Sequence, residues 1–252
     1  PFKEWVDGSS PSGLTINFFL MNFIFNTLKL LRTTYFKTLN NKSYSQFGED
    51  KILNEIIKKD HTDGFYVDVG CFHPKKHSNT YLLYKRGWSG INIDVEKDKL
   101  NVFNLARKRD HNTLVAISTN NQKKTVYRFG KFSVNTKTSR NTKVKFNDAV
   151  KDTYVIDSMS LDDVIKNSRF KRRKIDLLNI DIEGNDFDAL KSLDISKYIP
   201  KIIIIESHFI KINNIIKSDI YLYLTRKGYF LRSWCFYSLI FVKKNSKNTR
   251  SR

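Results

Sequence analysis

The chain has 252 residues, of which 40% are apolar, so it can bury the core of one large domain or two small ones. Lys and Arg number 45 against 25 Asp and Glu, and the formal charge of +20 favours an anionic partner: nucleic acid, an acidic lipid surface, or a phosphorylated or acidic sugar. Two cysteines, Cys71 and Cys235, exclude a disulfide framework and lack the spacing of a metal site, so we expect a reducing compartment, the cytoplasm.

Residues 13–32 form the most apolar stretch of the chain. Polar side chains interrupt it at Asn17, Asn22, Asn26 and Lys29. A membrane-spanning helix needs about 20 predominantly apolar residues. We therefore expect an amphipathic helix that packs on the domain or lies on a membrane surface, with packing preferred. The predicted organisation is an N-terminal extension (1–44), a main domain (45–244) and a basic tail (245–252).

After residue 44, apolar runs of strand length alternate with segments of helical period. The predicted helices are 49–59, 78–87, 99–108, 161–167, 186–193 and 218–228. The predicted strands are 64–70, 88–96, 111–119, 153–160, 174–184, 200–209, 229–236 and 238–244, with a possible edge strand at 124–130. The stretch from about 120 to 151 breaks the alternation, because it is polar and basic, and it is a candidate loop or lid.

Strands that are apolar on both faces and separated by helices indicate a parallel sheet with helices covering each side. The last two strands, 229–236 and 238–244, are separated by little more than Tyr237. They cannot both be parallel, because a parallel crossover needs a dozen or more residues. The fold class is therefore α/β, with a mostly parallel sheet that ends in an antiparallel hairpin.

Four of the predicted strands end in acids: Asp68, Asp94, Asp181 and Glu206. Ligands of open α/β sheets bind beyond the carboxyl ends of the strands, and a carboxylate about 20 residues after the first turn is the usual receptor for ribose hydroxyls. Asp94 lies 24 residues after Gly70. The loop after Gly70 lacks the further glycines of a pyrophosphate cradle, so the pattern disfavours a dinucleotide but not a nucleoside without phosphates. A single acid of this kind could also be a helix cap or one half of a surface ion pair.

Several spaced motifs resemble those of the FkbM-type methyltransferases, which use S-adenosylmethionine. The motifs are 45–53 (SQFGEDKIL), 64–94, 160–165 (SLDDVI), 175–194 (IDLLNIDIEGNDFDALKSLD) and 198–207 (YIPKIIIIES). The resemblance runs from about Ser45 to the end of the chain. It implies the Rossmann-like class I methyltransferase fold, a seven-stranded sheet with a C-terminal antiparallel hairpin, and O-methylation, typically of sugars or polyketide-like products.

The resemblance also implies roles for individual residues. Asp68 and Gly70 would line the methionine end of the cofactor. Asp94 would hold the ribose hydroxyls, and Ser118 would lie near the adenine. Four more residues fall in motifs that look like walls of the cofactor pocket: Gln46, Glu49, Ser78 and Asn79.

Methyl transfer to an alcohol requires alignment of the hydroxyl with the methyl group and removal of the hydroxyl proton. Either a general base or a divalent metal could assist that step. Asp181 and Glu206, at the ends of strands expected to be neighbours, are oxygen ligands suited to Mg²⁺, and Asp181 is expected to be essential in both cases. His208 is the best candidate base by its ordinary pKa, although it could also be a simple surface histidine.

The expected acceptor is a hydroxyl of a sugar, glycolipid or polysaccharide, anionic or lipid-linked, since such an acceptor accommodates both the positive charge and the apolar N-terminus. Peripheral membrane association and a homo-oligomer are further expectations. One alternative is a nucleic-acid methyltransferase acting on RNA ribose, which the basic insert supports, although such enzymes use lysines where this chain has Glu206. Another is a non-catalytic scaffold with the methyltransferase fold, which would not bind the cofactor.

Overall fold

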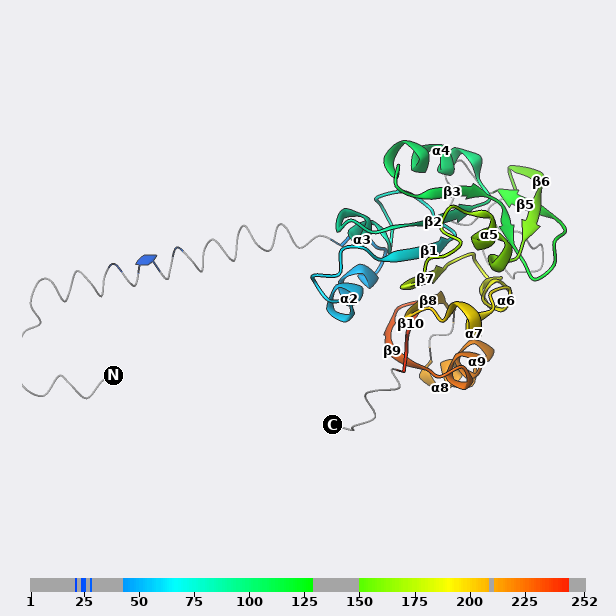
Figure 1. Ribbon diagram of the computed structural model, residues 1–252. Helices are drawn as coiled ribbons and strands as arrows, with labels where there is room; N and C mark the ends of the chain where they lie inside the picture. Colours follow the sequence, from blue (N-terminus) through cyan, green and yellow to red (C-terminus); the bar gives the residue numbers. More distant parts are fainter. Residues whose placement is uncertain are drawn as a thin grey trace, which may run out of the picture. The chain divides into compact units, whose positions relative to one another are not determined.

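The structure is a computed structural model (Figure 1) that describes residues 43–128, 150–208 and 211–244, together with Met21, Ile24, Phe25 and Leu28, which are helical. The chain divides into two compact units, residues 1–42 and 43–252. Most of the predicted helix 13–32, residues 129–149 of the basic insert and the tail 245–252 lie outside the described residues. Within the described part, no helix has both the length and the apolar character needed to cross a membrane.

The second unit alternates strands and short helices. The helices are α2 (Glu49–Ile56), α3 (Tyr81–Lys85), α4 (Lys97–Ala106), α5 (Leu161–Asn167), α6 (Asp186–Lys191), α7 (Ile195–Tyr198), α8 (Ile212–Ile215) and α9 (Asp219–Arg226). The strands are β1 (Phe65–Val69), β2 (Ser89–Asp94), β3 (His111–Leu114), β4 (Ala116–Ile117), β5 (Lys123–Arg128), β6 (Asp152–Met159), β7 (Leu177–Ile180), β8 (Ile202–Glu206), β9 (Tyr229–Cys235) and β10 (Ser238–Lys243). Serine hydroxyls cap two of the helices, Ser160 at α5 and Ser218 at α9, as the residues before the apolar runs suggest.

Seven strands form one sheet in the order β3-β2-β1-β7-β8-β10-β9 (Figure 1). The pairs from β3 to β8 are parallel, whereas β10 is antiparallel to both β8 and β9. Phe236 and Tyr237 alone separate β9 from β10. The α/β class, the mostly parallel seven-stranded sheet and the C-terminal antiparallel hairpin predicted from the sequence are therefore confirmed.

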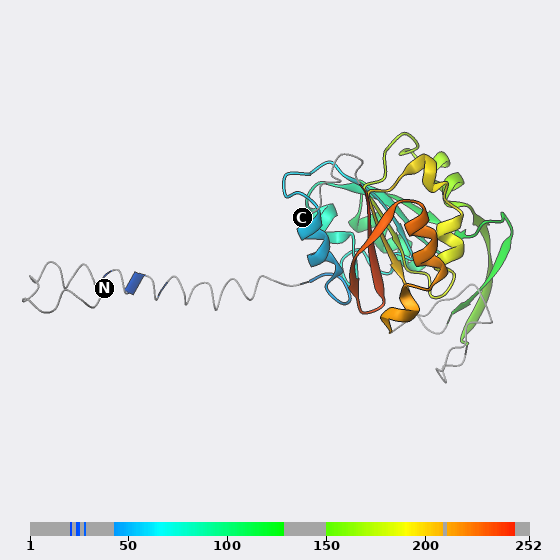
Figure 2. The same ribbon diagram turned by 90° about the horizontal axis from the view of Figure 1, so that it is seen from below.

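Both faces of the sheet are covered by helices (Figure 2), and alternate residues of each strand enter different cores. In β1, Phe65, Val67 and Val69 join the larger core with residues of α5, α6 and α9. Tyr66 joins the smaller core with residues of α2 and α3. Burial on both faces explains why the central strands are almost continuously apolar.

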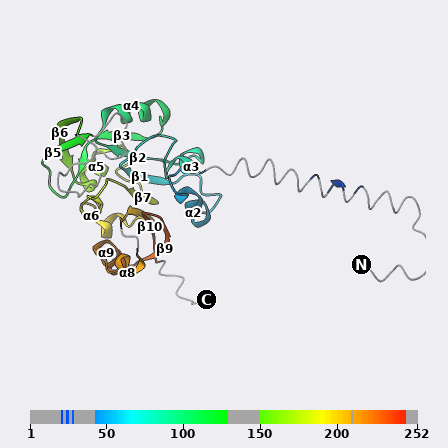
Figure 3. The same cartoon turned by 180° about the vertical axis from the view of Figure 1, so that it is seen from behind.

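The predicted strand 111–119 is wrong as a single element. Main-sheet pairing ends with β3, and β4 instead pairs in parallel with β6, which in turn pairs antiparallel with β5. These three strands form a separate small sheet, seen beside α5 in Figures 1 and 3. The hydroxyl of Tyr154 on β6 donates to the carbonyl oxygen of Val95 at 2.8 Å and so ties the small sheet to the end of β2. The one-turn helices α7 and α8 were not predicted, because four residues are too few to show a helical period.

Candidate active site

A cavity of about 480 Å³ lies at the carboxyl ends of the parallel strands, where open α/β sheets bind ligands. Its volume falls in the range of about 300–1,000 Å³ typical of small-molecule sites. The predicted site residues that line it are Gln46, Glu49, Asp68, Gly70, Ser78, Asn79, Asp94, Asp181, Glu206 and His208. Residues from four of the five motifs therefore meet at one place in the fold.

Ser118 is not one of the lining residues. Its hydroxyl donates to Asp188 on α6 at 3.3 Å, and the segment before it contributes Val115, Ala116 and Ile117 to the cavity wall. The difference follows from the split after β3, because the chain leaves the main sheet and turns toward β6 before it reaches residue 118. A position of Ser118 near the adenine stays a prediction.

Three polar residues stand on the same face of the sheet at the strand ends. Asp68 of β1 pairs with Asn179 of β7, and Glu206 ends β8. Tyr66, Leu177 and Ile204 of the same strands point into the smaller core. Asp68, Asn179 and Glu206 each follow two residues later, so they lie on the same face of the sheet. Asn179 was not predicted as a site residue, although a polar residue within the buried run 177–180 is a signal that could have identified it.

The Asp68 carboxylate is held on both oxygens. The Thr80 hydroxyl donates to Oδ2 and the Asn179 amide to Oδ1, both at 2.8 Å, and the Asn79 amide donates in turn to Asn179 at 2.9 Å. Burial raises the pKa of Asp68, whereas these donors act to lower it. Asp68 therefore fixes the loop 78–80 against the strand ends and gives the cavity a rigid polar floor.

Gly70 has a φ of 84° and ends β1 in the left-handed region. A Cβ atom on this residue would lie 1.7 Å from the carbonyl oxygen of Asp181. The sequence suggested that glycine here admits a ligand close to the backbone. In the structure, the packing of β1 against the end of β7 already requires a glycine.

We call the part of the cavity around Asp94, Glu96 and Lys99 the Asp94 end. The Lys99 ammonium lies 2.9 Å from Glu96 and 3.6 Å from Asp94, and all three side chains are buried. Burial raises the pKa of Asp94 to about 6, although Lys99 and the Glu96 backbone N–H oppose the rise. Burial lowers the pKa of Lys99, but the two acids together outweigh it, and the net pKa is raised. Lys99 was missed by sequence reasoning because lysine is so common on the surfaces of helices.

The opposite wall is joined to the C-terminal hairpin. Glu49 accepts hydrogen bonds from the Phe47 N–H at 2.9 Å and from the Ser238 hydroxyl at 2.8 Å. Gln46 is exposed and lines the cavity next to them. Glu49 thus links the segment before α2 to β10, across 189 residues of sequence.

A buried network behind the cavity holds the loop after β1. Arg107 is fully buried and donates to the Pro74 carbonyl at 2.8 Å, to the Tyr66 hydroxyl at 2.8 Å and to the Ser78 hydroxyl at 3.1 Å. Asp110 lies 3.7 Å from Arg107 and balances its charge. Nothing in the sequence distinguishes Arg107 from the many exposed basic residues, so this support of the site could not be predicted.

We call the part of the cavity around Asp181, Glu183, Glu206 and His208 the Glu206 end. Burial is the largest cause that raises the pKa of Asp181, to about 7, and that of Glu206, to about 10. Repulsion from Asp186 and Glu183 adds to both rises, and Asp181 also raises the pKa of Glu206. The hydrogen bond between the two side chains lowers the pKa of Asp181 and raises that of Glu206. The pair therefore retains a proton near neutral pH.

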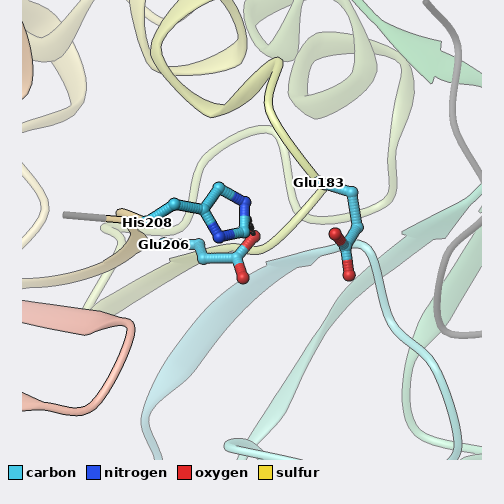
Figure 4. Close-up of side chains that lie close together, drawn as sticks. All are labelled: Glu183, Glu206 and His208. Atoms are coloured by element: carbon cyan, nitrogen blue, oxygen red, sulfur yellow. Dashed lines mark ion pairs between the residues drawn. The ribbon is translucent and has the colours of Figure 1, made fainter. Parts of the chain in front are cut away.

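Figure 4 shows how Glu183, Glu206 and His208 converge at this end. One potential ligand atom from each lies within 4.8 Å of those of the other two, and the His208 Nε2 is 3.7 Å from Glu206 Oε2. The sequence suggested Asp181 and Glu206 as metal ligands. Among the described residues, the three side chains whose potential ligand atoms lie close enough together for one cation are Glu183, Glu206 and His208, while Asp181 is hydrogen-bonded to Glu206.

Glu183 has a φ of 57°, a left-handed conformation that is rare for residues other than glycine, asparagine and aspartate. The Asp186 carboxylate holds this turn, since it accepts the N–H groups of Ile182 and Gly184, each at 2.9 Å. Backbone strain that surrounding contacts maintain is concentrated at functional sites. The strain here supports a role for Glu183 at the Glu206 end.

The donors and acceptors of the cavity fit a nucleoside cofactor. Asp94 Oδ1 accepts the Glu96 N–H at 2.8 Å, while Oδ2 has Lys99 at 3.6 Å and can accept ribose hydroxyls. Apolar Ile93, Val115 and Ile117 form the wall next to it, as the flat face of a base requires. Gly70 is the sole glycine among the described lining residues, so a phosphate cradle is not formed there.

Comparison with protein families matches residues 68–231 to the family described as "Methyltransferase FkbM domain". Among solved structures, a methyltransferase FkbM from Methylobacillus flagellatus is similar at 14% identity and a TM-score of 0.49, covering 79% of this chain and 48% of that protein. The chain therefore spans about half the length of that protein. A TehB-like SAM-dependent methyltransferase from Corynebacterium glutamicum gives 11% identity and a TM-score of 0.39, covering 87% of this chain and 97% of that one. No curated protein sequence matches this chain.

Proposed function

Because this chain belongs to the FkbM methyltransferase family, we propose that it transfers a methyl group from S-adenosylmethionine to a hydroxyl of a sugar, glycolipid or polysaccharide-type acceptor. The observation that carries the proposal is the joining of two chemically different ends in one cavity. The Asp94 end suits a nucleoside, and the Glu206 end offers acids and a histidine to a hydroxyl group. The two ends flank Asp68 and Gly70, where the methyl group would be presented.

The cofactor would supply an electrophilic methyl group, and the residues of the chain would position it. Asp94 would accept the ribose hydroxyls, while Asn79 and Asp68 would line the methionine portion together with Gln46. Alignment of this kind is the main source of rate enhancement in a displacement reaction. The entropy of the two reactants is lost when they bind, so it no longer adds to the barrier of the transfer step.

The Glu206 end would activate the hydroxyl, and two ways fit its residues. His208 is half exposed and lines the cavity, so it could accept the hydroxyl proton while Glu206, 3.7 Å away, orients the ring. Alternatively, Glu183, Glu206 and His208 could hold a divalent cation that lowers the pKa of the hydroxyl. Removal of divalent cations separates the two mechanisms.

The charge of the cavity favours a neutral, hydroxyl-bearing acceptor group at the point of transfer. Carboxylates accept hydrogen bonds from hydroxyls and repel phosphates. Lys99 is the sole Lys or Arg among the described lining residues, and Asp94 and Glu96 already engage it. Recognition of a nucleic-acid backbone would need several free cations, so this cavity favours a sugar over RNA.

The proposal is tested by calorimetric titration with S-adenosylhomocysteine, followed by transfer of a labelled methyl group from S-adenosylmethionine to a panel of methyl glycosides and to RNA. We expect micromolar binding and label in a glycoside as an ether stable to mild base. If the label appears in RNA alone, the acceptor is RNA ribose and the proposed sugar acceptor is wrong. No binding of the nucleoside would favour the scaffold alternative and overturn the methyltransferase proposal.

A further inference from the structure

A group of aromatic rings stands at the mouth of the cavity beside the Glu206 end. We define the aromatic rim as Phe47, Phe236 and Tyr237. The Phe236 ring centroid lies 4.5 Å from those of both Phe47 and Tyr237, and the His208 ring lies 5.5 Å from Tyr237. Phe47, Tyr237 and His208 line the cavity, so the rim continues its wall outward.

The rim leaves a large part of its apolar surface in water. Phe236 is 58% exposed and Phe47 is 39% exposed, although neighbouring apolar residues of β10, Leu239 and Ile240, are fully buried. Single exposed aromatics are ordinary, but clustered ones next to a polar cavity mark binding surfaces. The exposure therefore favours a ligand that covers these rings.

The backbone supplies a second, independent observation. Phe236 and Tyr237 form the two-residue loop between paired Cys235 and Ser238, and Phe236 has a φ of 54°. Tight hairpin loops that need a positive φ at this first position prefer glycine there. The Trp234 indole N–H donates to the Phe236 carbonyl oxygen and helps to hold the loop. A bulky ring at a position that favours glycine indicates that the ring itself is used.

We infer that the aromatic rim is the subsite for the ring of the acceptor, which the chemistry identifies as a saturated ring carrying several hydroxyls, such as a hexopyranose. The C–H groups of such a ring pack on the negatively polarised faces of Phe236 and Tyr237. Its hydroxyls then meet Glu206 and His208 at the cavity mouth. The inference rests on the proposed function and assigns the acceptor to this side of the cavity.

Features of the Glu206 end favour this occupant over other apolar or anionic ligands. Carboxylates at the rim's inner edge would repel a phosphate or an acidic lipid, and a purely apolar chain would leave Glu206 and Tyr237 without hydroxyl partners. A hydroxylated ring fits both the aromatic rim and the Glu206 end, because it has an apolar face and a polar edge.

The test measures the binding of nucleoside and sugar separately on the full chain. Saturation-transfer NMR would use methyl α- and β-glycosides of glucose, galactose, mannose, fucose and rhamnose, with S-adenosylhomocysteine present at saturation. We expect at least one glycoside to receive saturation on one face of its ring. That signal should fall at least tenfold in Phe236→Ala and in Phe236→Gly, while the affinity for S-adenosylhomocysteine stays within twofold of the wild type.

Phe236→Gly guards against misfolding, because glycine suits the backbone conformation at this position. Phe230→Ala is the matched control: it is 38% exposed, lies on the same hairpin and does not line the cavity, and its signal should match the wild type. A glycoside signal that persists in both Phe236 variants overturns the inference, as does a wild type that binds the nucleoside but none of the glycosides. Failure of the wild type to bind the nucleoside would refute the proposed function, and the inference would fall with it.

Discussion

The two ends of the cavity differ in the neighbours that they give to buried acids. At the Asp94 end, Lys99 lies 2.9 Å from Glu96 and 3.6 Å from Asp94, and all three side chains are at most 6% exposed. Burial raises the pKa of Asp94 only to about 6, whereas at the Glu206 end burial and neighbouring acids raise the pKa of Asp181 to about 7 and that of Glu206 to about 10. A lysine partly compensates the two acids of the first end, whereas the second retains a proton near neutral pH.

This difference separates binding from chemistry. An ion-paired group with fixed geometry stays ionised at and above neutral pH, which suits recognition of nucleoside hydroxyls. Groups with strongly raised pKa values can exchange a proton or a cation during a reaction, and such groups are typical of catalytic centres. Changes at the Glu206 end should therefore alter turnover, and changes at the Asp94 end should alter affinity.

The largest expected effect is on turnover at the Glu206 end. We expect His208→Gln to lower the rate of methyl transfer by about 100- to 10,000-fold, the range for loss of a general acid–base or metal-activating group. Affinity for S-adenosylhomocysteine, measured by calorimetry, should change less than twofold. His61→Gln is the control, since His61 packs against Trp88 and is not a lining residue. Equal losses of rate and nucleoside affinity in His208→Gln would contradict the separation of the ends.

A chelator decides how the Glu206 end activates the hydroxyl. If Glu183, Glu206 and His208 hold a divalent cation, treatment with EDTA should abolish transfer and Mg²⁺ or Mn²⁺ should restore it. Full activity in EDTA would assign proton removal to His208 alone. Manganese binding followed by electron paramagnetic resonance, with Glu183→Gln as the comparison, gives a readout that does not depend on activity.

At the Asp94 end, we expect Asp94→Asn to weaken binding of S-adenosylhomocysteine by about 100-fold, because hydrogen bonds to a charged group contribute about 1.5–3 kcal/mol each. Asp98→Asn is the matched control, since Asp98 is an exposed acid one turn along the same segment. An unchanged affinity in Asp94→Asn would remove this carboxylate from the cofactor site.

The raised pKa of Asp94 predicts how nucleoside binding responds to pH. The carboxylate accepts ribose hydroxyls only when ionised, and its pKa is about 6. Affinity should therefore be constant above about pH 7 and fall as the pH drops through 6, by about tenfold one unit below the pKa. Calorimetry from pH 5 to 8 measures this fall, and Asp94→Asn should show a flat profile. A wild-type affinity independent of pH would contradict the assignment.

The smallest expected effect is on stability at the aromatic rim. Phe236→Gly should raise the free energy of unfolding by about 1 kcal/mol, because relief of the left-handed conformation outweighs the entropy that glycine adds to the unfolded chain. Phe230→Gly, in the regular part of β9, should lower it by a similar amount. Urea denaturation measures both. A lower free energy of unfolding in Phe236→Gly would show that the packing of the ring stabilises the fold by more than the left-handed backbone conformation destabilises it.

The sequence predicted the features that repeat along the chain. Alternating apolar runs and helical periods gave the layers of the fold, and two strands without room for a crossover gave the hairpin. Acids at strand ends could be placed at one edge of the sheet because all parallel strands end there, and Asp68, Asp94, Asp181 and Glu206 line the same cavity.

Features that depend on contacts between distant segments could not be predicted in this way. Ser118 turns to Asp188 because the chain joins a second sheet, and Arg107 looks like any other basic residue of the chain until its burial is seen. Glu183 and Phe236 are set apart by a positive φ, which periodicity and composition do not reveal. The sequence thus brought these acids to one cavity but did not reveal part of the structure that holds it.

The pairing of β1 with β7 also bears on how the protein folds. Asp68 and Asn179, joined by a hydrogen bond at the centre of the sheet, are 111 residues apart in sequence, and Glu49 meets Ser238 across 189 residues. Closing such long loops reduces the conformational entropy of the chain before stabilising contacts form, so a topology of this kind folds slowly. During synthesis, the N-terminal half cannot complete the cavity until the last hairpin emerges. The protein therefore acquires its complete ligand-binding surface only once β10 has been synthesised, and shortening the chain before residue 238 removes one wall of it.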